Sequence, residues 1–210
     1  KEKKINNCKN FNIKNRSLGT IKKLLFNIKP DIILHLGSAN PSFNKKFKKI
    51  DYDNNVSFSK LLINFSSENK SKFIFASSSM IYKKTSKKIK ENSRIQISDY
   101  YSKFRINISD YLLKNKKKNK LNCTIIILFN HDSKFRNPRF LYPRLIKAIK
   151  KKNYSFIKKI YLYNINGDFS HASDICNGIY LLVKKNKNPD KIIFSSGKRT
   201  YVNDIIRYFI

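Results

Sequence analysis

The strongest apolar run of the chain is Thr124-Ile125-Ile126-Ile127-Leu128-Phe129, and the polar stretch Asn130-His131-Asp132-Ser133 follows it directly. Two further apolar runs lie at 31–36, before Gly37, and at 73–76, before three serines. Runs that are apolar on both faces are typical of parallel strands buried between two layers of helices. We therefore predict three buried strands here, with shorter strand candidates at 160–163 and 191–194.

Helical patterns fill the intervals between these runs. At 18–28, for example, Ile21, Leu25 and Ile28 recur at helical spacing. Strands that alternate with helices in this way indicate βαβ units, so the predicted fold class is α/β with a doubly wound parallel sheet. Further helices are predicted at 55–66, 100–113, 141–149, 173–183 and 202–209.

The composition is that of a folded globular protein, with 40% hydrophobic residues, 16 Phe and 12 Tyr. No run reaches the roughly eighteen apolar residues of a membrane helix, and the first residues carry no signal-peptide pattern. The cysteines at 8, 123 and 176 lack the spacing of a zinc site or of a disulfide framework. We expect a cytoplasmic protein with no metal site and no membrane partner.

The formal net charge of +33 suggests a nucleic-acid binder. The lysines, however, are spread over the whole chain beside an excess of Asn and Ile, a pattern that a codon bias toward A and T produces. The densest run, 114–120, is expected to be a helix end and a turn. We therefore expect no specific nucleic-acid partner, and nucleic-acid binding stays as an alternative that charge alone favours.

Small or polar residues follow each of the three predicted strands, at 37–40, 77–79 and 130–133. Ligands of open parallel sheets bind beyond the carboxyl ends of the strands. Gly37, Ser78 and Asn130 are therefore expected to converge on one cleft.

Motifs at these strand ends carry a family resemblance. The segment 76–82, A-S-S-S-M-I-Y, is similar to A-S-T-S-E-L-Y, and 128–133, L-F-N-H-D-S, is similar to L-F-N-H-E-S. The segment 168–174, D-F-S-H-A-S-D, is similar to D-W-G-H-A-x-D. These motifs resemble the extended short-chain dehydrogenases, the NAD-dependent epimerase/dehydratase family, and most of all its GDP-mannose 4,6-dehydratases. The resemblance covers nearly the whole chain.

The chemistry implied by the resemblance is hydride transfer at C4 of a nucleotide sugar, with a tyrosine that takes the hydroxyl proton. Ser78 matches the hydroxyl that binds the reacting oxygen, and Lys103 matches the lysine of the family's Tyr-x-x-x-Lys motif. That spacing would place the tyrosine at Asp99. Tyr100 shares a helix face with Lys103 and is the expected catalytic tyrosine, whereas Tyr101 is expected to face away.

Two positions depart from the resemblance. Met80 stands where the dehydratases carry the glutamate that removes the C5 proton, and a thioether cannot accept a proton in this way. Gly167 replaces an arginine. The Met80 departure therefore argues against a 4,6-elimination. Epimerisation or reduction of a related nucleotide sugar, or a degenerate non-catalytic relative, remain open as alternatives.

The implied cofactor is NADP or NAD, and the implied partner is a nucleotide sugar such as GDP-mannose. Asn130 and Arg144 are expected to contact that substrate. A homo-oligomer is expected for the full-length protein. The cofactor contacts implied by the resemblance are Asn12, Ile13, Leu36, Gly37, Ser38, Tyr52, Lys103, His131 and Arg136.

The implied organisation has two parts in a Rossmann-like, NAD(P)-binding fold. Residues 1–130 form a partial NAD(P)-binding domain, and 131–210 form a substrate-binding portion interleaved with the last sheet elements. None of the five glycines belongs to a phosphate-binding loop, which the family carries on its first strand and helix. We expect that loop to lie ahead of residue 1, within about 60 missing residues, or two βαβ halves of about 30.

Overall fold

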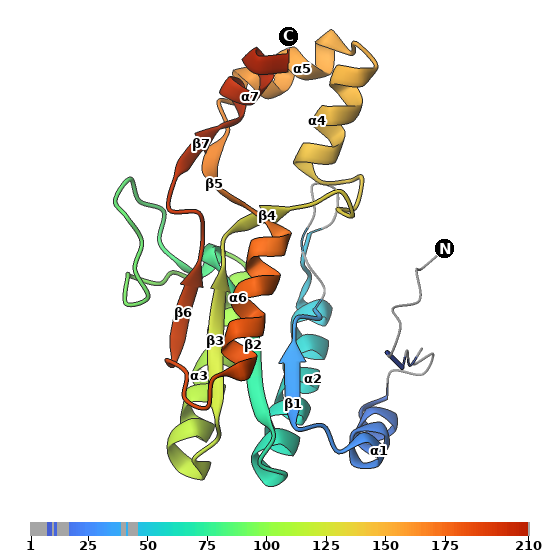
Figure 1. Ribbon diagram of the computed structural model, residues 1–210, viewed down its shortest axis with the longest axis vertical. Helices are drawn as coiled ribbons and strands as arrows, with labels where there is room; N and C mark the ends of the chain where they lie inside the picture. Colours follow the sequence, from blue (N-terminus) through green and yellow to red (C-terminus); the bar gives the residue numbers. More distant parts are fainter. Residues whose placement is uncertain (1–7, 10, 12–16, 39–40, 42–45, 210) are drawn as a thin grey trace.

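The computed structural model describes residues 8–9, 11, 17–38, 41 and 46–209 (Figure 1). Its main sheet is parallel, with strand order β1-β2-β3-β6. The predicted α/β class with a doubly wound parallel sheet is thereby confirmed. The strands are β1 (Ile32–His35), β2 (Lys72–Ser78), β3 (Cys123–Leu128) and β6 (Lys191–Phe194).

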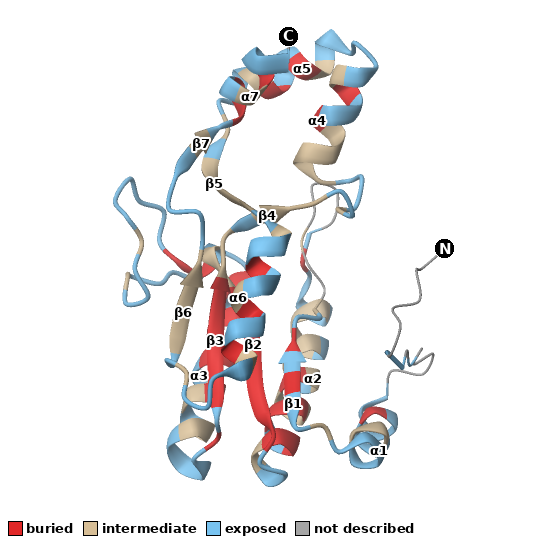
Figure 2. Ribbon diagram, in the orientation of Figure 1, coloured by how far each residue is buried: buried red, intermediate tan, exposed pale blue. Residues whose placement is uncertain are grey.

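Helices cover both faces of this sheet because side chains along each strand point alternately to opposite sides. Phe73 and Phe75 of β2 pack in one core with α2 (Lys49–Glu68) and α3 (Tyr100–Asn119). Ile74, between them, packs in a second core with α6 (Ala172–Lys184), which crosses the other face (Figure 1). The two central strands are buried over most of their length (Figure 2).

A second, smaller sheet lies beyond the carboxyl edge of the main one and has the order β4-β5-β7. Here β4 (Asn130–Asp132) pairs parallel with β5 (Asn166–His171), and β5 pairs antiparallel with β7 (Arg199–Tyr201). Three helices pack into a core of their own at this end, with Leu145, Ile157 and Val202 at its centre. They are α4 (Leu141–Lys150), α5 (Tyr154–Leu162) and α7 (Val202–Phe209).

The remaining elements are α1 (Leu18–Ile28) and the short 3-10 helix η1 (Ser79–Ile81). Helix α1 starts at the N-cap Ser17, whose hydroxyl accepts a bond from the Thr20 N–H. No helix in the described ranges is both long and apolar enough to cross a membrane.

One strand prediction was wrong, and a second was wrong in part. Residues 160–163 do not form a strand: they end α5, because Ile157 and Ile160 are buried at helical spacing behind an Asn153 N-cap. Strand β1 was expected to be buried on both faces. Ile32 and Leu34 are instead 36% and 39% exposed, since α6 covers the neighbouring strands and not β1.

Four exposed helix ends place a lysine in the left-handed backbone region, where glycine is favoured. Lys120, which ends α3 with φ 53°, is one of them. We expect Lys120→Gly to raise the free energy of unfolding by about 0.5–1 kcal/mol, because the left-handed region costs other residues about 1–2 kcal/mol. The matched variant Lys114→Gly, inside α3, should lower it by about 1 kcal/mol. Urea denaturation of both variants measures the two signs, and equal losses would contradict the expectation.

Candidate active site

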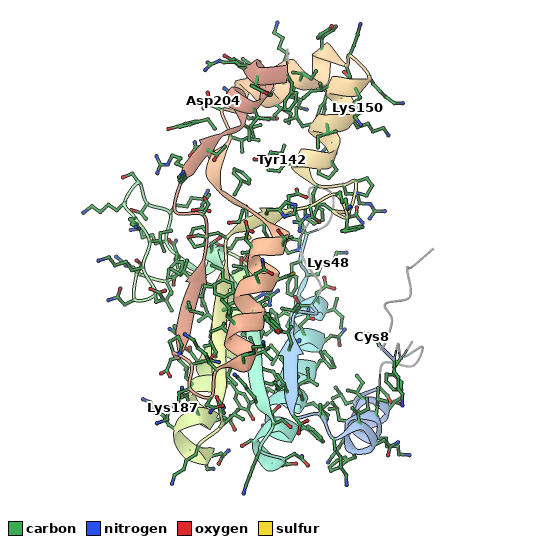
Figure 3. All side chains as sticks on the ribbon, viewed as in Figure 1. Cys8, Lys48, Tyr142, Lys150, Lys187 and Asp204 are labelled. Atoms are coloured by element: carbon green, nitrogen blue, oxygen red, sulfur yellow. The ribbon has the colours of Figure 1, made fainter. Side chains whose placement is uncertain are left out.

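A cavity of about 540 Å³ lies between the carboxyl edge of the main sheet and the C-terminal elements. Leu36 directly follows β1, Ser78 ends β2 and Asn130 follows β3, and all three line this cavity. The structure thus brings the three strand ends together, with Leu36 on the cavity wall rather than Gly37 beside it. On the far side, Tyr142 projects from α4 toward β5, where its ring meets Phe169 edge-on (Figure 3).

The first turn of α3 is oriented differently from the sequence expectation. Tyr100 is 41% exposed, and its ring lies 6.0 Å from that of Tyr52 on α2. The Lys103 Nζ atom lies 5.5 Å from the centre of the same Tyr52 ring. Tyr101 is only 7% exposed and lines the cavity. The structure therefore does not bring Tyr100 and Lys103 to the cavity, and it places Tyr101 there.

Arg105 follows Tyr101 by one helical turn and also lines the cavity. Its guanidinium is buried, donates to the Ala76 carbonyl of β2, and donates to Ser38 Oγ at 2.6 Å. Burial lowers the pKa of Arg105, and the neighbouring Tyr101 opposes that shift. The pair Tyr101 and Arg105 has the Tyr-x-x-x-Lys spacing, with arginine in place of lysine.

The end of β2 presents hydroxyl groups to the cavity. Ser78 Oγ accepts a hydrogen bond from the Met80 N–H at 3.3 Å, so its own O–H can point to a ligand. Ser77 Oγ is buried at the wall with no hydrogen-bond partner among the described residues. Met80 is 46% exposed and lines the cavity at the position where the resemblance implies a glutamate.

The residues after β3 supply a hydrogen-bond acceptor and a cation. His131 Nδ1 lies 2.9 Å from the Phe129 carbonyl, which can only accept, so Nδ1 carries the hydrogen and the neutral ring keeps Nε2 as an acceptor. The Arg136 guanidinium stacks 3.7 Å from the centre of the Phe140 ring. Its Nε is buried and has no hydrogen-bond partner in the described part of the chain. Both side chains line the cavity.

Gly167 makes room for Asn130. A Cβ atom at Gly167 would lie 3.1 Å from Asn130 Nδ2 and 3.4 Å from the Phe169 ring. Any other residue at 167 would therefore press on the Asn130 amide, which lines the cavity. Gly167 stands where the resemblance implies an arginine, and its lack of a side chain leaves room for the Asn130 amide at the start of β4.

The charge of the cavity wall is mainly positive. Asp132 is the one carboxylate among its described residues, against the two guanidinium groups of Arg105 and Arg136. Burial, with a smaller contribution from Asp132, raises the pKa of Tyr142 to about 12. Tyr142 therefore stays a neutral hydrogen-bonding group at physiological pH. A wall of this kind suits an anionic ligand that carries hydroxyl groups.

The other residues expected to bind ligands lie away from the cavity or outside the described residues. Tyr52 accepts a 2.8 Å bond from Asn107 Nδ2, in the contact between α2 and α3. The Arg144 guanidinium lies 4.8 Å from the Phe156 ring. Asn12 and Ile13 fall outside the described residues. Among the described wall residues, those that the sequence singled out for a ligand are Leu36, Ser78, Asn130, His131 and Arg136.

Several solved structures share this fold. An NAD dependent NDP-hexosamine 5,6-dehydratase involved in tunicamycin biosynthesis is 19% identical, with a TM-score of 0.74 over 89% of this chain and 61% of that chain. The UDP-glucuronic acid 4-epimerase of Bacillus cereus, in complex with UDP-glucuronic acid and NAD, is 20% identical, with a TM-score of 0.75 over 95% and 63%. The dTDP-glucose 4,6-dehydratase of Bacillus anthracis, in complex with NAD, is 13% identical, with a TM-score of 0.74 over 92% and 60%.

The chain spans less than two thirds of the length of these three structures, and at such identities the likeness shows the fold. No curated protein matches the sequence. The sequence profile of one family, however, matches residues 1–197, which is nearly the whole chain. The chain therefore belongs to the NAD dependent epimerase/dehydratase family.

Proposed function

We propose that the chain forms the catalytic part of an enzyme that uses NADP or NAD to oxidise a nucleotide sugar at C4, in the manner of the GDP-mannose 4,6-dehydratases. One observation carries the proposal: Ser78, Tyr101 and Arg105, from β2 and α3, meet at one cavity beyond the carboxyl edge of a parallel sheet. Family membership supports the cofactor class.

The residues of the cavity fit the reacting ends of such ligands. The unpartnered Ser77 Oγ and Arg136 Nε offer hydrogen-bonding groups to a polyhydroxylated anion. Bound NADP or NAD supplies the acceptor for the C4 hydride. The Tyr101 side chain, acting as the phenolate, takes the proton of the C4 hydroxyl group and becomes the neutral phenol, and the Ser78 O–H hydrogen-bonds the reacting oxygen. Arg136 binds the diphosphate of the nucleotide sugar, since a guanidinium matches phosphate geometry.

A second candidate, favoured by Met80, is an epimerase or reductase of a nucleotide sugar. Elimination between C5 and C6 needs a base for the C5 proton, and the Met80 thioether cannot serve. Asp132, the one carboxylate of the described wall, accepts a hydrogen bond from the Ser133 N–H at 2.7 Å. Oxidation and reduction at C4 need no such base.

Turnover in deuterated water separates the two candidates. The full-length protein is incubated with GDP-mannose, UDP-glucose or dTDP-glucose and with NADP or NAD, and the products are analysed by NMR. A dehydratase yields a 4-keto-6-deoxy sugar with deuterium at C5, whereas a C4 epimerase or reductase leaves the C5 hydrogen in place. The proposed function is rejected if nucleotide sugars neither bind nor react under any of these conditions.

A further inference from the structure

We propose that Arg105 is a positioning residue that locks the reacting tyrosine and ties the ends of β1 and β2 together, and that a lysine cannot replace it. The inference rests on the proposed function, because it concerns the geometry of the same site. It differs from the sequence expectation, in which Lys103 supplies the cation.

The two terminal nitrogens of Arg105 bind different partners. Nη1 donates to the main-chain oxygen of Ala76, within β2. Nη2 donates to Ser38 Oγ, beyond the end of β1, at 2.6 Å. The guanidinium holds its donors in a rigid planar fork, so one side chain of α3 fixes two strand ends at once. A lysine has a single nitrogen on a flexible stem and would have to serve both acceptors with it.

The Tyr101 ring is in contact with both Arg105 and Phe47. The Arg105 guanidinium carbon lies 4.9 Å from the centre of that ring, and the Phe47 ring meets it edge-on with centroids 5.5 Å apart. The ring is thus held between a cation and an aromatic edge, both of which favour its orientation. The same guanidinium lies 5.1 Å from the Phe104 ring and 5.5 Å from the Phe75 ring, which hold it in turn.

The Arg105 side chain also carries a permanent positive charge. A buried ammonium group readily loses its proton, whereas a guanidinium keeps its own at all physiological pH values. Among the residues that the structure describes, the titratable groups that interact with Arg105 include Tyr101 on its own helix and His35 on β1, whose pKa Arg105 helps to lower. Arg105 therefore places a constant positive charge beside the phenol that exchanges a proton, and beside a His35 ring that stays neutral.

The test compares Arg105→Lys and Arg105→Ala in the full-length protein, with Arg207→Lys at an exposed position as the matched control. We expect Arg105→Lys to lower kcat about 10- to 100-fold, with less than a threefold change in KM for the nucleotide sugar, and Arg207→Lys to keep wild-type kinetics. Arg105→Ala should lower kcat further than Arg105→Lys does. It should recover part of its kcat when guanidinium is added at millimolar concentration, and none with methylammonium.

A second measurement does not depend on turnover. In protein with ring-labelled tyrosine, assigned by means of Tyr101→Phe, NMR should show faster flipping of the Tyr101 ring in Arg105→Ala than in the wild type. The inference is overturned if Arg105→Lys keeps wild-type kcat, or if Arg105→Ala is folded and its Tyr101 ring flips at the wild-type rate. A wild-type protein that turns over no nucleotide sugar instead refutes the proposed function, and the ring-flip result still decides whether Arg105 locks Tyr101.

Discussion

Tyr101→Phe is expected to lower kcat by about 10²- to 10⁴-fold, which is the usual contribution of a positioned acid–base group. The variant removes the phenolic oxygen that exchanges the C4 proton and leaves the ring. Ring contacts with Phe47 and Arg105 are therefore retained, so the fold and KM for the nucleotide sugar should change little. Steady-state kinetics with the substrate found in the turnover screen, together with a thermal melt, measure both effects.

The neighbouring Tyr100→Phe is the matched variant. Its phenol is exposed and its ring packs near Tyr52 on the outer side of α3, so we expect kcat within about threefold of the wild type. The reverse result, with Tyr100→Phe inactive and Tyr101→Phe active, would restore the assignment made from the sequence and remove Tyr101 from the proposed mechanism.

The main sheet could be predicted because its strands are apolar on both faces. In β2 and β3 every residue from Phe73 to Ala76 and from Ile125 to Ile127 is buried. The short length of these runs and the apolar residue at every position were therefore enough to indicate central parallel strands. The second sheet had no such signal. Strands β4 and β7 are three residues each, β5 carries mostly polar residues, and all three pair over short stretches. Their position depends on tertiary contacts.

The strand ends that form the site were predicted from the sequence, but the face of α3 that points to the cavity was not. Ser78, Asn130 and His131 line the cavity because the carboxyl ends of parallel strands share one edge. The phase of α3 could have been read from the buried positions 101, 104, 108 and 112, which follow helical spacing and place Tyr101 inward. Motif spacing to Lys103 pointed to Tyr100 instead.

Long-range polar contacts had no signal in the sequence. Arg105 reaches Ser38 across 67 positions of the chain. Lys72, a buried residue of β2, donates to the carbonyl groups of Leu182, Val183 and Lys185 at the end of α6, more than 100 positions away. A single sequence shows only that these cations exist. The fold decides which of the many Lys and Arg side chains are buried and what they contact.

The protein is expected to lose about 3 kcal/mol of stability between pH 6.5 and pH 4 because of His35 alone, since each pKa unit corresponds to about 1.4 kcal/mol. Burial, with a smaller contribution from Arg105, lowers the pKa of His35 from 6.5 to about 4. The imidazole lies among Phe58, Phe73 and Phe75, and its Nε2 is 2.8 Å from Ser59 Oγ. No water-exposed face is left to solvate a positive charge, because His35 is only 4% exposed.

The sign follows from which state binds the proton. Above pH 6.5 the imidazole is neutral in both states and the full stability is present. Between pH 6.5 and about 4 the unfolded chain binds a proton that folded His35 does not, so stability falls as the pH falls. Below about pH 4 both states are protonated, and this contribution to the loss stops growing.

Urea denaturation of the wild type and His35→Gln, at pH 7.5 and at pH 4, isolates this contribution. Glutamine can still hydrogen-bond Ser59 but does not titrate, so we expect the drop in the free energy of unfolding to be about 3 kcal/mol smaller in the variant. Ser59→Ala serves as the matched variant. This variant removes the hydroxyl that hydrogen-bonds His35 and leaves the imidazole buried, so it should lower the free energy of unfolding by about 1 kcal/mol at both pH values. The drop in that free energy between pH 7.5 and pH 4 should stay at the wild-type size, since burial is the main cause of the pKa shift of His35. Equal drops in the free energy of unfolding for the wild type and His35→Gln would mean that water solvates His35 in the folded state, and that β1 does not pack closely against α2.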